Sequence, residues 1–456
     1  MSRCVALLGL GVATWALGCG ASRRAGRAGD PPRADELIPR LFDATTVYRS
    51  MGFLVAGAPL PYVAGVRYLA APAPDSTLAL FSLSLANQVL SFRRDGDEFR
   101  GDYHVELTFR GPEGVAGQVV RDETVRVRTF QETQRTDESV IFQHTLALPP
   151  GAYEVSMLVR DRNSPNLARA QDSDTVPVLA GRGIASPIPF YEGGGRARLS
   201  DLPQLVVNPR ATLPYGGDSL KFYFEVYGSS PGGRLALRAV NARGAEIWRD
   251  TVALAGDPTI ATAIVGLGSG QLPLGQAALE AQVVGSALLA RAPLLVSFSN
   301  QWVITNFDDI IGLLRYFEYG DWVTRLAKAP EAERPALWQE FWRATDPVPL
   351  TPENEALEGY FRRVQAANVR FREEGEPGWL TDRGEVYITL GEPDEVYEIN
   401  QAVASRTGNR AQRWTYTVHR LILYFLDETG FSRYRLTPSS RAEYHRVLAR
   451  VRASRQ

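Results

Sequence analysis

The sequence predicts a multidomain, mainly β protein with an α+β C-terminus. We expect two antiparallel β-sandwich (Ig-like) domains, a helical segment, and a small helix plus β-hairpin module. Three observations predict this fold class. Apolar and polar residues alternate along many short stretches between residues 47 and 298, which is the period of strands with one buried face. Apolar residues recur at helical spacing over residues 299–375, and residues 376–456 carry dense turn and cap signals.

The first sandwich is predicted over residues 47–180. Val105, Leu107 and Phe109 alternate with polar neighbours, as expected of a strand with one buried face. A further strand is expected from Tyr153 to Val159, after a turn rich in proline and glycine. Many short strands at this spacing are typical of an antiparallel sandwich. Residues 181–203 are rich in glycine and proline and are predicted to be a linker.

The second sandwich is predicted over residues 204–298. Leu220, Phe222 and Phe224 alternate with polar residues. Leu272-Pro273-Leu274-Gly275 precedes an apolar strand, as Leu148-Pro149-Pro150-Gly151 does in the first sandwich. We interpret this repeated turn as a sign of two related sandwiches.

The helical segment is predicted over residues 299–375. Asn306 is a suitable N-cap for a helix that carries Ile310 and Leu314 on one face. Another helix is expected to begin at Thr351-Pro352, because threonine caps helices and proline suits the first helical position.

The C-terminal module, residues 376–456, begins with the pentad Gly378-Trp379-Leu380-Thr381-Asp382. Asp382 is predicted to cap a short helix, Gly391 to end it and Pro393 to block its continuation. Strands are expected over residues 421–426 and 431–436, joined as a hairpin by a turn that ends in glycine.

This module resembles the GWxTD domain, a family of bacterial exported proteins named for the pentad, over roughly the last third of the chain. The match continues through Leu390-Gly391-Glu392-Pro393-Asp394-Glu395. A weaker similarity is to the BamE/SmpA-type lipoprotein of the outer-membrane β-barrel assembly machinery. In that type a capped helix ending in Leu-Gly-x-Pro precedes an aromatic strand and a hairpin, which here are Trp414 to Tyr416 and Leu421 to Phe425. The resemblance implies a role in the cell envelope and brings no known reaction.

The N-terminus resembles a bacterial lipoprotein signal. A basic start and a short apolar stretch from Val5 to Ala16 precede Cys19, and the apolar stretch has the length of a signal peptide rather than of a membrane span. We expect residues 1–18 to be the signal, Cys19 to be lipidated, and residues 19–46 to be a tether. A plain secretory signal is the alternative. Gly20, rather than an aspartate, favours the outer membrane, and we expect the chain to face the periplasm.

Composition narrows the classes of partner and cofactor. The net charge is −1, which gives no reason to expect a nucleic-acid partner. The four histidines lie in different predicted elements without metal-ligand spacing, so neither a metal nor another cofactor is expected. Cys4 would leave with the signal, and the single remaining cysteine suits a lipid anchor better than redox chemistry.

The acids of the module are the best candidates for catalysis. Asp382, Glu385, Glu392, Asp394 and Glu395 could act as acid–base pairs if burial separated their pKa values. The simpler interpretation assigns them to caps and turns, so we predict no catalytic residue. The tryptophans of the helical and C-terminal parts are predicted to lie mainly in the core. The candidate docking or motif residues are Gly378, Trp379, Thr381, Asp382, Gly391, Pro393, Asp394 and Trp414.

The sequence therefore favours a non-enzymatic cell-envelope lipoprotein, a scaffold or assembly factor that docks another envelope protein at the outer membrane. One alternative is a surface-exposed glycan-binding or adhesion protein. The other is a hydrolase of envelope polymers that uses the acids of the module. The step from an exported β-rich chain to a docking partner is an analogy at the level of fold.

Overall fold

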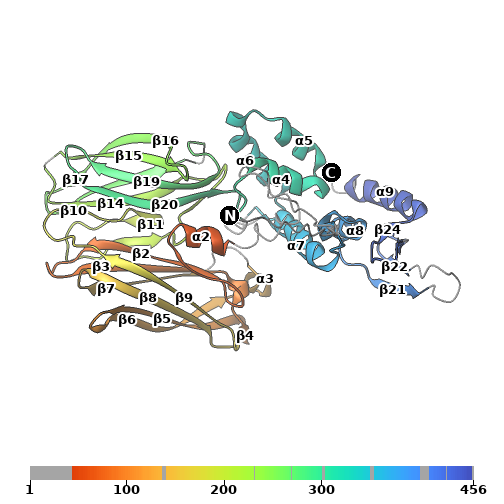
Figure 1. Ribbon diagram of the computed structural model, residues 1–456, viewed down its shortest axis with the longest axis horizontal. Helices are drawn as coiled ribbons and strands as arrows, with labels where there is room; N and C mark the ends of the chain where they lie inside the picture. The colour runs from red at the N-terminus through yellow and green to blue at the C-terminus, as the bar shows by residue number, and fades with distance from the viewer. Residues whose placement is uncertain are drawn as a thin grey trace, which may run out of the picture.

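The structure is a computed structural model that describes residues 44–135, 140–230, 232–268, 270–299, 303–349, 354–400, 410–427 and 429–453. The predicted signal and Cys19 lie outside the described residues. The chain is mainly β, with several antiparallel sheets and a C-terminal module of helices and strands, which confirms the predicted fold class. Four sheets are stacked in layers, and the helices and the C-terminal module lie together at one end of the stack (Figure 1).

Two sheets form the first sandwich. One has the strand order β1-β2-β3-β7, and the other has the order β4-β5-β8-β9 with β6 also paired to β5. Val105, Leu107 and Phe109 of β5 are fully buried, as their alternation predicts. The strands are β1 (Leu54–Ala56), β2 (Tyr62–Ala70), β3 (Thr77–Leu85), β4 (Phe92–Asp95), β5 (Glu98–Gly111), β6 (Gly114–Val127), β7 (Val140–Leu148), β8 (Gly151–Asp161) and β9 (Leu167–Val176). Three short helices accompany them: α2 (Thr45–Ser50), η1 (Asn87–Val89) and α3 (Phe130–Thr133).

Two further sheets form the second sandwich. Their orders are β12-β11-β14-β18-β17, with β10 paired to β14, and β13-β20-β19-β15-β16. The strands are β10 (Gly183–Ile184), β11 (Ile188–Gly194), β12 (Gln204–Val207), β13 (Thr212–Pro214), β14 (Leu220–Tyr227), β15 (Arg234–Asn241), β16 (Glu246–Ala253), β17 (Ala255–Gly256), β18 (Ala261–Leu267), β19 (Gly275–Val283) and β20 (Leu289–Ser297). Residues 181–203 are therefore not a plain linker, because they contain β10 and β11.

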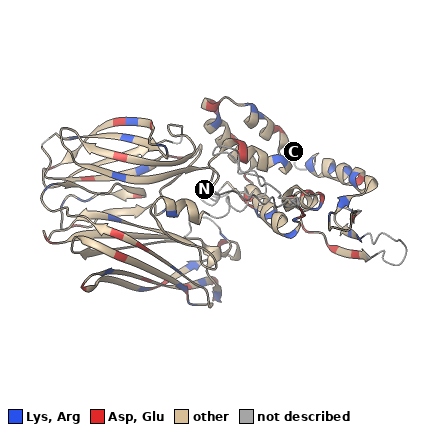
Figure 2. Ribbon diagram, viewed as in Figure 1, with Lys and Arg blue, Asp and Glu red and all other residues tan. Residues whose placement is uncertain are grey.

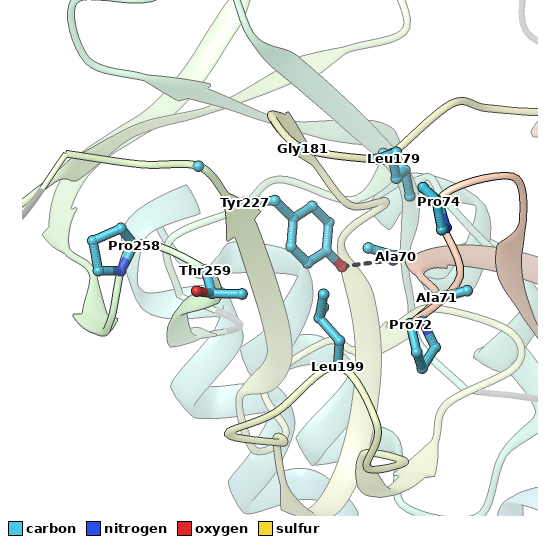
Figure 3. A pocket seen from close by; sticks show the side chains of 12 residues that line it. Ala70, Ala71, Pro72, Pro74, Leu179, Gly181, Leu199, Tyr227, Pro258 and Thr259 are labelled. Carbon is cyan, nitrogen blue, oxygen red and sulfur yellow. Dashed lines mark hydrogen bonds between the residues drawn. The ribbon is translucent and has the colours of Figure 1, made fainter.

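The two sandwiches share an interface. All nine residues of β3 are buried, because one face of its sheet packs on the other sheet of the first sandwich and the opposite face packs on the second sandwich. Arg196 and Glu225, both with fully buried side chains, form an ion pair at this seam with Nη2 and Oε2 2.9 Å apart. Arg196 also donates to the carbonyl of Ala70 (2.7 Å). The Tyr227 hydroxyl accepts from the N–H of Ala70 at 2.9 Å, beside an apolar pocket of about 360 Å³ (Figure 3).

The helical segment links the second sandwich to the C-terminal module. Asn306 caps α4 by accepting from the N–H groups of Asp308 and Asp309, as predicted. The next cap is Asn354, whose side chain accepts from Leu357 N at 3.0 Å, so the helix expected to begin at Thr351 begins at residue 355. The elements are α4 (Phe307–Leu313), η2 (Leu314–Tyr316), α5 (Gly320–Lys328), η3 (Glu331–Glu333), α6 (Arg334–Thr345) and α7 (Glu355–Arg370).

The C-terminal module is larger than the predicted helix and hairpin. It contains η4 (Gly378–Leu380), α8 (Asp382–Leu390) and a sheet of order β21-β22-β23-β24, followed by α9 (Pro438–Ala453). The strands are β21 (Glu395–Asn400), β22 (Arg410–Tyr416), β23 (Leu421–Asp427) and β24 (Arg435–Leu436). β24 is shorter than the strand predicted over residues 431–436. Asp427 accepts from the N–H groups of Thr429, Gly430 and Ser432, which holds that segment in a turn.

One apolar core runs from the second sandwich through the helices into the module. Phe298 meets Trp338 of α6 edge to face, with ring centroids 4.6 Å apart. The hydroxyl of Tyr360 on α7 donates to the carbonyl of Leu313 on α4 at 2.5 Å. Shared burial of this kind fixes the module relative to the second sandwich. Among the described residues, no helix combines the length and the apolar composition needed to cross a membrane.

Candidate functional site

Two glycines allow the pentad to pack against α7 and α8. A Cβ on Gly378 would overlap the carbonyl oxygen of Ala367 near the end of α7, and a Cβ on Gly384 would overlap the carbonyl oxygen of Gly378. The backbones therefore approach more closely than any larger residue permits. Close packing thus explains Gly378, the glycine of the pentad, and Gly384, which lies two residues after the end of the pentad.

Thr381, not Asp382, caps α8. Its hydroxyl accepts from the N–H of Gly384 at 3.1 Å and donates to the carbonyl of Gly378 at 2.8 Å. The prediction that Asp382 is the cap is therefore wrong by one residue. Asp382 instead accepts from Leu436 N (2.7 Å) and from Arg441 Nη2 (2.5 Å). Its carboxylate thus ties the start of α8 to β24 and α9.

Trp379 is a core residue. It is 4 % exposed, and its ring meets that of Tyr316 edge to face with centroids 6.4 Å apart. The guanidinium of Arg315 lies 5.8 Å from the centre of the Trp379 ring, within the range of a cation–π contact. The prediction that the tryptophans are mainly core is consistent with this burial and with that of Trp338 and Trp414. Trp379 therefore presents no exposed ring face to a partner.

A buried glutamate that the sequence analysis missed organises the inner side of the module. The side chain of Glu373 is fully buried and accepts from Arg383 Nη2 at 3.1 Å and Arg435 Nη1 at 2.9 Å. It also accepts from the N–H of Tyr434 at 3.0 Å. These partners lie 10 to 62 residues away, so no local pattern in the sequence indicates the cluster.

The end of α8 follows the prediction. Gly391 has a φ of +85°, a conformation that favours glycine, and its carbonyl accepts from the Tyr416 hydroxyl at 3.1 Å. After Pro393, the Asp394 carboxylate accepts from Thr417 N at 2.5 Å. This hydrogen bond from the backbone of Thr417 lowers the pKa of Asp394. Asp394 thus fixes the turn between β22 and β23 against the start of β21.

The acids of the module are engaged in structural contacts. Glu392 forms a bidentate pair with Arg370, at 2.5 and 2.7 Å, and hydrogen bonding to Arg370 lowers the pKa of Glu392. Glu385 accepts from the hydroxyl of Tyr444 at 3.1 Å. A general acid needs a raised pKa, whereas the carboxyl shifts found here, at Glu392 and Asp394, favour the ionised form. These contacts place Glu392, Asp394 and Glu385 in hydrogen bonds that join elements of the module.

A pocket of about 350 Å³ opens beneath β21. Trp414, 2 % exposed, forms one wall and contacts Phe371 with ring centroids 5.4 Å apart. The predicted motif residues Pro393 and Trp414 meet here, together with residues of α7, α8 and β21. The lining residues are Arg370, Phe371, Arg383, Pro393, Val396, Gln412 and Trp414.

The outer face of the sheet exposes apolar and aromatic side chains. Tyr397, Arg413 and Tyr424 lie in register across β21, β22 and β23, and the Arg413 guanidinium lies 4.3 Å from the centre of the Tyr397 ring. Tyr397 is 48 % exposed and Tyr424 41 %. Ile422, one row away, is 49 % exposed. We call Tyr397, Arg413, Ile422 and Tyr424 the outer sheet face.

Charge and metal-ligand chemistry point to no other site. Acidic and basic residues are interspersed over the β layers and the module (Figure 2). Within the part of the chain that the structure describes, no group of three or more His, Cys, Asp and Glu side chains could hold a metal ion. His104 pairs with Asp122 at 2.7 Å, and His144 stacks on Phe142.

Comparison with known proteins identifies the C-terminal part. Residues 290–437 match the model of the GWxTD domain. The match begins within β20 and ends just before α9, so the domain includes the helical segment that we predicted as a separate unit. No curated protein matches the chain.

Two solved structures resemble the chain only distantly. One is the BSP domain of a biofilm-associated protein, 8 % identical, covering 57 % of this chain and 54 % of that one with a TM-score of 0.17. The other is a Bifidobacterium dentium β-glucuronidase complexed with coumarin-3-O-glucuronide, also 8 % identical, covering 58 % and 56 % with a TM-score of 0.18. The chain spans just over half the length of each. These likenesses are too low to support a functional argument.

Proposed function

We propose that this protein is a non-enzymatic scaffold or assembly factor of the cell envelope, which docks another envelope protein through its GWxTD domain. The observation that carries the proposal is the outer sheet face. Tyr397, Ile422 and Tyr424 are each at least 41 % exposed on one sheet, and tyrosine is enriched where proteins contact one another.

The arrangement behind this face supports docking rather than chemistry. Leu423 and Phe425, on the inner face of β23, are fully buried against the core, and the same core continues into the second sandwich. A rigid sheet held in this way can bind a partner without first paying the entropic cost of ordering itself. The stacked sandwiches would then act as a spacer.

Site-specific photocrosslinking in living cells tests this proposal. We expect a crosslinking amino acid at Tyr424 to capture one discrete envelope protein. The same amino acid at Ile264, which is 53 % exposed on β18 of the second sandwich, is the control and should not capture that protein. If Tyr424 gave no adduct, or the two positions gave the same adducts, docking through the outer sheet face would be wrong.

Anchoring to the outer membrane through a lipid on Cys19, facing the periplasm, is part of the proposal. It is supported by the signal-like N-terminus described above. Cys19→Ser should abolish incorporation of labelled palmitate and move the chain from the membrane fraction to the soluble periplasmic fraction. An unlabelled wild-type chain, or a Cys19→Ser chain that stays in the membrane fraction, would rule out this anchor.

Glycan binding is the second candidate, because Tyr397 and Tyr424 flank Arg413 on an exposed sheet. Aromatic faces beside a hydrogen-bond donor suit a sugar ring. Tyr424→Ala would then abolish retention of the purified protein on isolated envelope polysaccharide. Under the docking proposal, neither the wild type nor this variant is retained on the polysaccharide. Protease treatment of intact cells would remove the protein only if it faced outward, as an adhesion role requires.

A further inference from the structure

Two buried N–H donors in the wall of the pocket beneath β21 have no acceptor among the described residues. They are Nε1 of Trp414 and Nε of Arg383, in residues that are 2 % and 9 % exposed. Buried donors are rarely left unpaired, because each then loses its hydrogen bond to water without replacement. We propose that this pocket binds a carboxylate, and that the carboxylate is an acidic side chain of an extended peptide that pairs with the edge of β21.

The charges around the pocket favour an anion over a neutral acceptor. Its lining includes Arg370 and Arg383 and no acidic residue. The carboxylates that pair with these arginines, Glu392 and Glu373, lie outside the lining. Burial lowers the pKa of Arg383 despite its contact with Glu373, so a further anion would stabilise the charged guanidinium. Planar guanidinium groups suit carboxylate oxygens in particular.

The aromatic walls suit the stem of an acidic side chain. Phe371 and Trp414 offer apolar ring surface against which the methylene groups of a glutamate would pack, while its oxygens accept from the two free donors. A volume of about 350 Å³ is enough for one side chain and too little for a folded element. The pocket therefore fits a single residue of a longer partner.

The position of β21 favours a peptide as the source of that residue. β21 is the end strand of its sheet and pairs with β22 on one side, so within the described chain its other edge has no strand partner. An extended segment can add to such an edge through backbone hydrogen bonds. Val396 of β21 lines the pocket, so an inward-facing side chain of an added strand would lie beside it. This inference deepens the proposed docking function and rests on it.

Trp379 shows that a free indole N–H alone does not make the site. Its Nε1 is also buried without a partner, but Trp379 packs on Tyr316 and does not line the pocket. The two tryptophans thus form a matched pair, in which the same substitution removes the same kind of donor inside and outside the proposed site.

Indole N–H resonances of the ¹⁵N-tryptophan-labelled full chain provide the test. The probes are N-acetylglutamate methylamide, its glutamine counterpart, and propionate. We expect the glutamate probe to shift the Trp414 indole N–H downfield in a saturable way and to leave that of Trp379 in place. Trp414→Phe assigns the resonance. Because this variant lacks the reporting N–H, its affinity is measured by calorimetry and should be about tenfold weaker, the loss expected for one hydrogen bond to a charged group. Trp379→Phe should not weaken binding.

Each other outcome contradicts the inference. No saturable shift at Trp414 would exclude a carboxylate site. Equal binding of the glutamine probe would show that charge is not recognised, and equal binding of propionate would show that the peptide backbone contributes nothing. Circular dichroism of both variants checks that they fold. These results are independent of crosslinking at Tyr424, so failure of this site is distinguished from failure of docking through the outer sheet face.

Discussion

At the scale of single residues, the pentad is a packing motif. Gly378 and Gly384 admit the backbones of their neighbours, Thr381 caps α8, and Trp379 fills the space beside Tyr316. Each of these residues either adjusts the packing or pairs a backbone N–H group. Asp382 joins α8 to α9 through Arg441. The side chains of the motif thus hold together the junction of α7, α8 and α9.

Gly384→Ala should destabilise the protein by more than about 2 kcal/mol, because the added methyl group overlaps backbone that cannot move without shifting α8. Gly359→Ala is the control: it also replaces a helical glycine, but its Cβ would meet only the flexible end of Arg363 at 3.6 Å. That change should raise stability by roughly 0.5–1 kcal/mol. Urea unfolding of both variants measures the difference. Similar stabilities for the two would contradict the close-packing account.

Residue types were easier to predict from the sequence than their partners. Gly391 and Asn306 were predicted correctly, because a helix end imposes its requirement on one local residue. Thr381 and Asp382 are adjacent and both are good caps, so composition could not choose between them. The burial of Glu373 could not be predicted from the sequence, because its hydrogen-bond partners come from α8 and the region of β24, far away in the sequence.

At the scale of elements, alternation identified strands with one buried face and failed for the others. β5 alternates because one side faces the core. β3 is buried along its whole length, so its burial does not follow the alternation of Phe81, Leu83 and Leu85 with two serines. β10 and β11 were hidden by the glycines and prolines that led us to predict a linker over residues 181–203. α9 was missed because its buried residues are few, Ser440, Tyr444 and Val447.

The turn between β22 and β23 should respond to acid through Asp394. The lowered pKa of Asp394 means that its ionised form stabilises the fold. This contribution is complete above the pKa of aspartate in the unfolded chain, which is about 4. It is lost as the pH falls through the lower pKa that Asp394 has in the folded protein. Asp394→Asn should therefore lose less stability than the wild type between about pH 5 and pH 3.

Thermal unfolding across that pH range measures the effect. Glu395→Gln is the control, since the neighbouring Glu395 carboxylate makes no hydrogen bond within the described residues. Its pH profile should follow that of the wild type. An Asp394→Asn profile parallel to the wild-type one would show that the contact with Thr417 does not couple folding to protonation.

At the scale of the whole molecule, the seam between the sandwiches depends on a buried ion pair. Arg196 and Glu225 have no exposed side-chain surface, and the hydroxyls of Tyr223 and Tyr227 both donate to Glu225. Such a pair gains little over an apolar replacement, yet removing one partner leaves the other charge buried and uncompensated. The pair holds the Arg196 guanidinium where it also donates to the carbonyl of Ala70 on β2, which links the two sandwiches.

Arg196→Met should destabilise the protein by about 3–5 kcal/mol, because Glu225 then remains buried without its cation. The double variant Arg196→Met with Glu225→Met should recover part of this loss. Arg198→Met is the control: Arg198 pairs with Asp201 at the surface and is 78 % exposed, so the cost should stay below about 1 kcal/mol. Denaturant unfolding gives all three values. Equal losses of stability for Arg196→Met and Arg198→Met would show that burial of the Arg196–Glu225 pair does not matter for the fold.

The complete burial of β3 has a mechanical consequence. Because the sheet that contains this strand is covered on both faces, sliding one sandwich over the other would expose its apolar side chains to water. One apolar cluster joins the C-terminal module to the second sandwich, and a smaller cluster around Tyr48 and Leu295 joins that sandwich to α2. If a partner docks on the outer sheet face as proposed, this continuous packing sets its distance from α2.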